Sequence, residues 1–119
     1  MSGVHRHRFT RSMRYALHGL SIAWGEQNFR IQTSCLLVVL MFAAFFRVSR
    51  TEWLFLLLVS ILVLVLELVN TIFEQFTDFF SPRYSEMARA VKDIMAAAVF
   101  VASVGAVAVG ALIFGPHVF

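Results

Sequence analysis

A stripe of polar residues directly follows an apolar run in the middle of the chain. Residues 53–66 carry no charge, and Glu67, Asn70, Glu74 and Asp78 come next. On a helix that turns by about 100° per residue, the three carboxylates fall within roughly 40° of one another. Carboxylates can hold Mg²⁺ and can accept the proton of an attacking hydroxyl group. The stripe therefore predicts metal binding or acid–base chemistry at the end of an apolar helix.

Glu67 has the strongest claim to a function because of its expected depth. A span that begins at Trp53, an interfacial type of residue, places Glu67 about 21 Å further along the helix axis. A hydrocarbon core is roughly 30 Å thick, so Glu67 would lie inside the far leaflet. A charge at membrane depth costs on the order of 3 kcal/mol and usually serves a function. Glu74 and Asp78 lie closer to water and could be solvated residues at a helix end.

Three further charged residues are expected at the same membrane face: Glu26, Lys92 and Asp93. A lysine can neutralise a transferring phosphoryl group, and carboxylates can supply a base and a Mg²⁺ site, so the parts of a phosphoryl-transfer site are present. There is no Walker A loop and no kinase Gly-rich loop, so an ATP site would be unconventional. Lys92 and Asp93 could also simply extend to the membrane surface. The residues alone leave two classes open, a membrane enzyme and a small cation-conducting or transport subunit.

The composition indicates an integral membrane protein. Of 119 residues, 60% are hydrophobic, and the mean hydropathy of +0.80 is too high for a small soluble domain. We predict an all-α fold in one domain over residues 1–119, with three transmembrane helices. Its expected segments are a basic tail at 1–8, an amphipathic surface helix at 9–25, and spanning helices at about 29–46, 53–78 and 86–114.

Small residues are frequent in the third predicted span, which Gly115-Pro116 is expected to end. Because small residues let helix backbones approach closely in lipid, we expect this helix to lie centrally in a bundle or an oligomer. The only cysteine, Cys35, lies in an apolar run and is expected to be buried.

The basic residues predict the orientation of the chain in the membrane. The formal net charge is +3, and most Lys and Arg residues fall in the N-terminal segment and in the 79–92 region. Cytoplasmic segments are enriched in these residues, so the N-terminus and the polar stripe are expected in the cytoplasm. Aromatic and basic residues are not interleaved on a common surface, and we expect no nucleic-acid partner.

Several motifs together resemble the prokaryotic diacylglycerol kinase and undecaprenol kinase family. The likeness runs from about Arg11 to Pro116. Its motifs are Glu67-x-x-Asn70-Thr71-x-x-Glu74-x-x-x-Asp78, Ala90-x-Lys92-Asp93-x-x-Ala96-Ala97-Ala98-Val99, Arg14-Tyr15-Ala16-x-x-Gly19-Leu20, Glu26-x-Asn28-Phe29-Arg30 and Ser49-Arg50-Thr51-Glu52-Trp53. The chain departs from the commoner pattern at Thr71-Ile72-Phe73, at Ser85, and at Gln32, where some diacylglycerol kinases have Glu.

The resemblance implies a homotrimer whose sites are shared between neighbouring protomers in a bacterial inner membrane. It implies ATP- and Mg²⁺-dependent phosphorylation of a membrane lipid alcohol, either diacylglycerol or undecaprenol, at the cytoplasmic face. Glu67 matches the catalytic base of the family, and Glu26 and Glu74 match its metal ligands. The positions that match the nucleotide site are Asn70, Glu74, Tyr84, Lys92 and Asp93.

Overall fold

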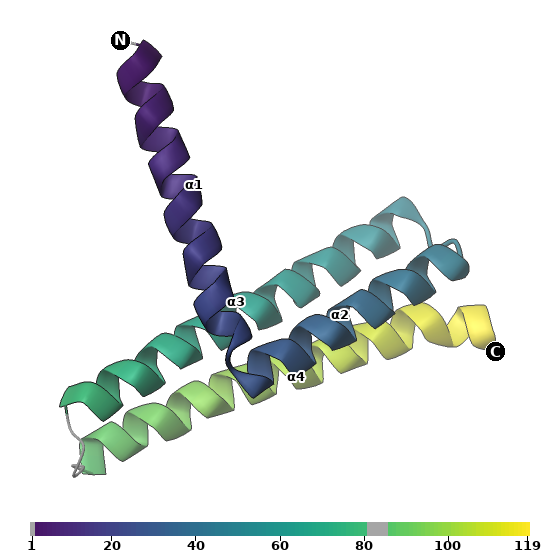
Figure 1. Ribbon diagram of the computed structural model, residues 1–119. Coiled ribbons are helices and arrows are strands. Elements are labelled where there is room, and N and C mark those ends of the chain that lie inside the picture. Colours follow the sequence, from purple (N-terminus) through teal and green to yellow (C-terminus); the bar gives the residue numbers. More distant parts are fainter. Residues whose placement is uncertain (1, 81–85) are drawn as a thin grey trace.

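The computed structural model describes residues 2–80 and 86–119, and over these residues the chain is helical (Figure 1). Its elements are α1 (Ser2–Trp24), α2 (Gln27–Phe45), α3 (Arg50–Phe80) and α4 (Glu86–Val118). Helices α2, α3 and α4 run side by side, and α1 projects away from them (Figure 1). The three bundled helices are long and apolar enough to cross a membrane. The predicted all-α architecture with three candidate spans is therefore confirmed.

The beginning of α3 is set by a reciprocal pair of hydrogen bonds. The backbone N–H of Ser49 donates to the Glu52 carboxylate at 2.8 Å, and the backbone N–H of Glu52 donates to Ser49 Oγ at 3.1 Å. Such a capping box satisfies backbone donors that have no partner within the helix. The helix consequently begins at Arg50, before the predicted start at Trp53.

A tight reversal connects α2 to α3. The N–H of Val48 donates to the carbonyl of Ala43 at 3.2 Å, and the N–H of Arg47 donates to the carbonyl of Ala44 at 3.3 Å. This pattern is a Schellman motif, which needs a left-handed residue directly after the helix. Arg47 takes that place with a φ of 51°, unusual for a residue with a side chain.

The best-packed part of the bundle lies at this end of the molecule. A cluster of buried hydrophobic residues lies there, with members from α2, α3, α4 and the turn between α2 and α3. These residues are Ala43, Val48, Leu56 and Ile113. The ring of Phe46 also packs near that of Phe114 on α4, with centroids 6.0 Å apart. Since lipid is as apolar as these side chains, close packing rather than burial from water holds the helices together. The polar stripe lies toward the other end of α3, where a cavity opens beside Glu67.

The first and last helices also differ from their predicted boundaries. α1 already begins at Ser2, so the residues of the expected tail that are described, 2–8, are helical. Arg is a good helix former, and Thr10 Oγ1 donates to the carbonyl of Arg6 at 2.9 Å within this segment. α4 continues through Pro116 to Val118. Proline removes one hydrogen bond there, but the N–H of Phe119 donates to the Gly115 carbonyl at 2.8 Å and closes the last turn.

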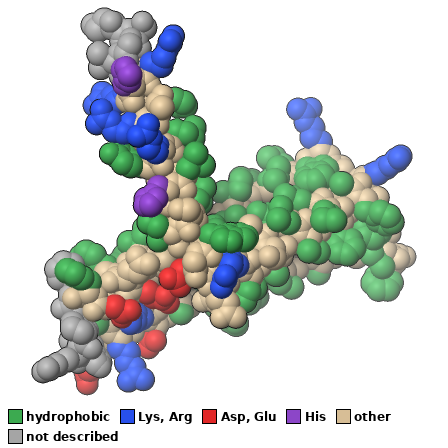
Figure 2. All heavy atoms as spheres, in the orientation of Figure 1, with side chains coloured by type: hydrophobic (Ala, Val, Ile, Leu, Met, Phe, Trp, Pro, Cys, Tyr) green, Lys and Arg blue, Asp and Glu red, His purple; other side chains and the backbone are tan. Residues whose placement is uncertain are grey.

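Cys35 is exposed on α2, contrary to the expectation that it would be buried. Much of the surface of α2, α3 and α4 is likewise apolar (Figure 2). A helix that is apolar on all sides can face lipid or another chain, so its hydrophobic pattern does not specify which residues face the protein interior.

Candidate active site

Glu67 is buried on α3 together with its polar neighbours. It is 3% exposed, Asn70 is 5% exposed, and Thr71 is also buried. Thr71, one helical turn beyond Glu67, donates a hydrogen bond from Oγ1 to the Glu67 backbone carbonyl at 3.0 Å. This bond gives the buried hydroxyl group of Thr71 a partner. A buried carboxylate in a long apolar helix is costly, so this cluster is the first candidate for a catalytic centre.

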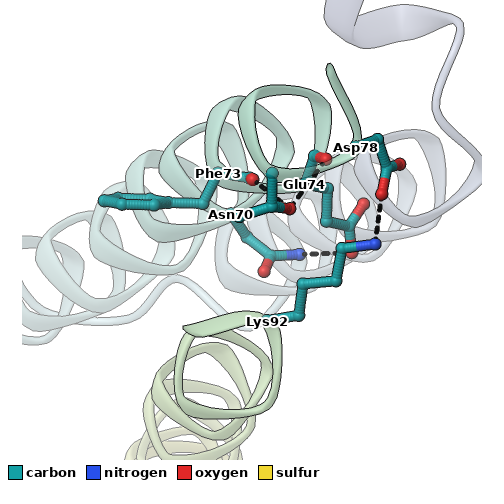
Figure 3. Close-up of polar contacts among 6 residues, drawn as sticks. Asn70, Phe73, Glu74, Asp78 and Lys92 are labelled. Carbon is teal, nitrogen blue, oxygen red and sulfur yellow. Dashed lines mark hydrogen bonds and ion pairs between the residues drawn. The ribbon is translucent and has the colours of Figure 1, made fainter. Parts of the chain in front are cut away.

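Asn70 connects Glu67 to the next turn of the stripe. Its Nδ2 donates to Glu74 Oε1 at 3.3 Å (Figure 3). Its side chain also interacts with the Glu67 carboxylate. The other amide atom, Oδ1, is buried and has no hydrogen-bond partner among the described residues. Buried polar atoms are seldom left unpaired. Asn70 is therefore oriented by Glu74 and retains an acceptor for a ligand or water.

Asp78 and Lys92 bring the end of α3 against the start of α4. The Lys92 ammonium forms an ion pair with the Asp78 carboxylate (Figure 3). The side chains are 38% and 66% exposed, respectively, so the pair contributes little to stability by itself. Its importance is positional, because it places a cation beside the carboxylate stripe. Asp93, the next residue, is exposed.

Glu26 reaches the same region from α2. It occupies the N-cap position with extended backbone angles, φ −87° and ψ 129°, but its side chain makes no capping hydrogen bond. Its charge and that of Glu74 both act on Glu67. Acidic side chains gather on this face of the bundle, close to where α1 joins it (Figure 2). Glu26, Glu67 and Glu74 thus lie in one region of the bundle, and their roles stay predictions.

A cavity of about 330 Å³ opens beside Glu67. Its walls come from the first turns of α2, from Glu67 on α3 and from the middle of α4. The lining residues are Asn28, Ile31, Gln32, Glu67, Ala96, Val99, Phe100 and Ser103. Glu67 is the acidic residue among them, so a molecule in this cavity would meet one carboxylate and otherwise amide, hydroxyl and apolar groups.

The oxygen ligands of this site suit a metal ion that binds together with a phosphate ligand. They do not suit an ion that the protein holds by itself. Within residues 2–80 and 86–119, no three His, Cys, Asp or Glu side chains are arranged to hold a metal by themselves. Mg²⁺ is usually bound through one or two carboxylates, with phosphate oxygens and waters completing its shell. The two half-buried carboxylates, Glu26 and Glu74, fit that mode. Tyr84, predicted at the nucleotide, lies outside the described residues.

Several polar residues within the spans have no role predicted from the sequence. Gln32 Nε2 on α2 donates to Ser103 Oγ on α4 at 3.4 Å, and Thr33 Oγ1 is buried with no partner among the described residues. The available signal was the presence of an amide and hydroxyls inside charge-free segments, because polar groups in lipid need partners.

A buried carboxylate, Glu67, faces a cavity between long apolar helices, which indicates a membrane protein with an enzyme-like centre. Comparison with known proteins makes the class specific. The family described as prokaryotic diacylglycerol kinase matches residues 14–114. The chain belongs to this family, whose characterised relatives are named as lipid kinases.

Individual relatives agree with this assignment. The chain is 38% identical over 107 residues to a diacylglycerol kinase of Synechocystis sp., covering 88% of this chain and 61% of the relative. It is 33% identical over 110 residues to an undecaprenol kinase of Bacillus subtilis, covering 92% of this chain and 89% of the relative. A diacylglycerol kinase of Helicobacter pylori is 29% identical over 92 residues. The chain thus spans less than two thirds of the Synechocystis relative.

Proposed function

We propose that this chain phosphorylates the hydroxyl group of a membrane lipid, diacylglycerol or undecaprenol, at the cytoplasmic face of the bacterial inner membrane. ATP is the phosphoryl donor, and Mg²⁺ accompanies it. The observation that carries the proposal is the burial of Glu67 in the wall of a cavity between membrane-spanning helices. A carboxylate in that place meets hydroxyl groups carried by lipids, whereas sugars and other water-soluble alcohols remain outside.

Glu67 acts as the general base of the reaction. The lipid hydroxyl oxygen forms a bond to the γ-phosphorus of ATP while the bond from that phosphorus to the β,γ-bridging oxygen breaks. The hydroxyl proton passes to the Glu67 carboxylate and then to water, and the electron pair of the broken bond leaves with ADP. A positioned base contributes about 10² to 10⁴ in rate. The buried Asn70 and Thr71 hold the helix and the carboxylate in place.

The remaining residues of the site bind and orient the nucleotide. Glu26 and Glu74 hold Mg²⁺, which neutralises charge on the phosphates when it is bound. The Lys92 ammonium contacts the phosphoryl group that is transferred. Asn70 offers its unpaired Oδ1 as an acceptor to the bound ligand or to water. The family motifs also assign Asp93 and Tyr84 to the nucleotide. These assignments follow the family motifs and the convergence of α2, α3 and α4 on one region.

The working unit is proposed to be a homotrimer with sites shared between protomers. Many large apolar side chains are exposed on the single chain. On α4, a Cβ added at Gly105 or Gly110 would meet no described atom within 4 Å, so neighbouring helices could approach closely there. α1, whose described side chains from His5 to Ile22 are all exposed, lies along the membrane surface with Arg11 and Arg14 toward anionic headgroups.

Radiolabelled ATP with mixed lipid acceptors in detergent tests the proposal. The purified chain should transfer the γ-phosphate to diacylglycerol or undecaprenol, and chelation of Mg²⁺ should stop the transfer. The competing assignment, a cation-conducting subunit, predicts ion flux through vesicles and no labelled lipid. Lys92 argues against that alternative, because a cation path gains nothing from a lysine at its entrance.

A further inference from the structure

A second cavity lies next to the one that contains Glu67. It has a volume of about 250 Å³ and is bounded by all three bundled helices. Apart from a few hydroxyl and amide groups, its walls are apolar. They include Cys35 and Leu36 from α2, Leu56 and Val63 from α3, and Phe114 from α4. We call this space the apolar groove and the space beside Glu67 the acidic cavity.

Two residues line both spaces, Gln32 on α2 and Ser103 on α4. They are joined by the hydrogen bond from Gln32 Nε2 to Ser103 Oγ. At 3.4 Å this bond is longer than the usual 2.7–3.2 Å, so it is weak. Because α2 and α4 each pack mainly against α3, the bond crosses the space between them. A ligand that occupies both the acidic cavity and the apolar groove would therefore lie against this pair.

We propose that Gln32 and Ser103 bind the ester groups of a diacylglycerol and thereby select it over a polyprenol as acceptor. The inference rests on the proposed lipid kinase function. The hydroxyl to be phosphorylated must reach Glu67 in the acidic cavity, and an acyl chain fits the apolar groove. The glycerol esters, which lie between these two parts of the lipid, then fall beside the pair that separates the spaces.

The chemistry of the pair matches an ester. The Gln32 amide and the Ser103 hydroxyl each supply a hydrogen-bond donor, and ester carbonyl oxygens are acceptors. The pair exchanges its weak mutual bond for bonds to the lipid, so neither group is left unpaired in an apolar setting. A polyprenol carries its hydroxyl directly on a hydrocarbon chain. It offers no acceptor at this level, and the Gln32–Ser103 bond would remain as it is.

Substitutions that remove only the hydrogen-bonding groups test this specificity. Gln32→Met keeps a chain of similar length, and Ser103→Ala keeps a small side chain. In mixed micelles, the KM for a short-chain diacylglycerol should rise by about fivefold in each variant, the effect of one lost hydrogen bond. The KM for a short-chain polyprenol and the KM for ATP should stay unchanged. Ser34→Ala is the matched control, because Ser34 is exposed on α2 and is not among the described residues that line either cavity.

The possible outcomes separate this inference from the proposed function. Equal increases in the KM for diacylglycerol and the KM for polyprenol would show that the pair only supports the helices. Unchanged KM values for both lipids would show that the pair does not contact the lipid. Either result contradicts the inference. A wild-type protein that accepts polyprenol but not diacylglycerol overturns the inference and leaves the kinase assignment intact. A folded wild-type protein that phosphorylates neither lipid overturns both.

Cys35 provides an independent readout of the apolar groove, because it is the only cysteine in the chain and lines that groove. A membrane-permeant maleimide should alkylate it, and added diacylglycerol should slow the alkylation several-fold, whereas ATP should not. Alkylation that is insensitive to diacylglycerol contradicts the placement of the acyl chain. Cys35 could also resist alkylation in the folded protein without added lipid, while the SDS-denatured chain is labelled rapidly. That result would indicate that a second copy of the chain fills the groove, which also contradicts the inference.

Discussion

Lys92 at the start of α4 is paired with Asp78 near the end of α3, one helical turn beyond Glu74 on the same stripe (Figure 3). The contact brings the ammonium to the carboxylate cluster from a different helix. Since both side chains are partly exposed, the pair can open at little cost when a more highly charged partner arrives. Nucleotide phosphates are such partners, so the pair holds Lys92 close to the place where we propose that it acts.

Substitution of Lys92 should separate a phosphate-binding role from simple surface exposure. We expect Lys92→Met to be inactive and Lys92→Arg to be severely impaired, because a planar guanidinium does not replace a compact ammonium at a shaped site. Phosphorylation rates of both variants, measured beside a sizing run that monitors assembly, check this expectation. Full activity of Lys92→Arg would mean that any long cation at the interface suffices, and activity of Lys92→Met would remove the phosphate role.

Glu26 and Glu74 should act together on Mg²⁺ although they lie on different helices. We expect Glu26→Gln and Glu74→Gln each to raise the Mg²⁺ concentration needed for half-maximal activity, because each removes one charged oxygen ligand. A Mg²⁺ titration of each variant at saturating ATP measures the change. Glu86→Gln is the control, since Glu86 is an exposed residue of the first turn of α4. Unchanged Mg²⁺ activation in both site variants would place the ion elsewhere.

The capping box of α3 should contribute to stability without affecting catalysis. Ser49→Ala removes the hydroxyl that accepts the Glu52 N–H, which costs about 1 kcal/mol at a helix N-terminus. We expect a lower Tm in detergent and a normal kinase rate below the transition, because Ser49 lies at the end of α3 opposite the site. Thr51→Ala, at an exposed position of the same turn, should have a smaller effect. Equal losses of Tm in the two variants would show that the capping box contributes nothing.

Helical spacing was sufficient to predict the polar stripe. Residues Glu67, Asn70 and Glu74 share a face because of the helix repeat alone, and the charge-free run before them predicted the burial of Glu67. The Ser49-x-x-Glu52 pattern would also have given the start of α3, since it is a recognisable capping box. Local sequence therefore determines which residues lie on one turn and where a helix begins.

Contacts between helices could not be predicted in the same way. The Asp78–Lys92 and Gln32–Ser103 pairs depend on how α2, α3 and α4 are placed along one another, and nearly uniform apolar surfaces do not fix that placement. The exposure of Cys35 has the same cause. The helical state of residues 2–8 was missed because a cluster of basic residues was interpreted as a tail, although Arg favours helix.

The rate of phosphoryl transfer by Glu67→Gln shows whether the buried carboxylate is the general base. The amide keeps the size of the carboxyl group but cannot accept the hydroxyl proton, so lipid phosphorylation from γ-labelled ATP should fall by about 10² to 10⁴ relative to the wild type. Nucleotide binding and the sizing profile should be retained, which would show that the variant is folded. Near-wild-type phosphorylation by well-folded Glu67→Gln would contradict the account, because the buried carboxylate would then have no part in the reaction.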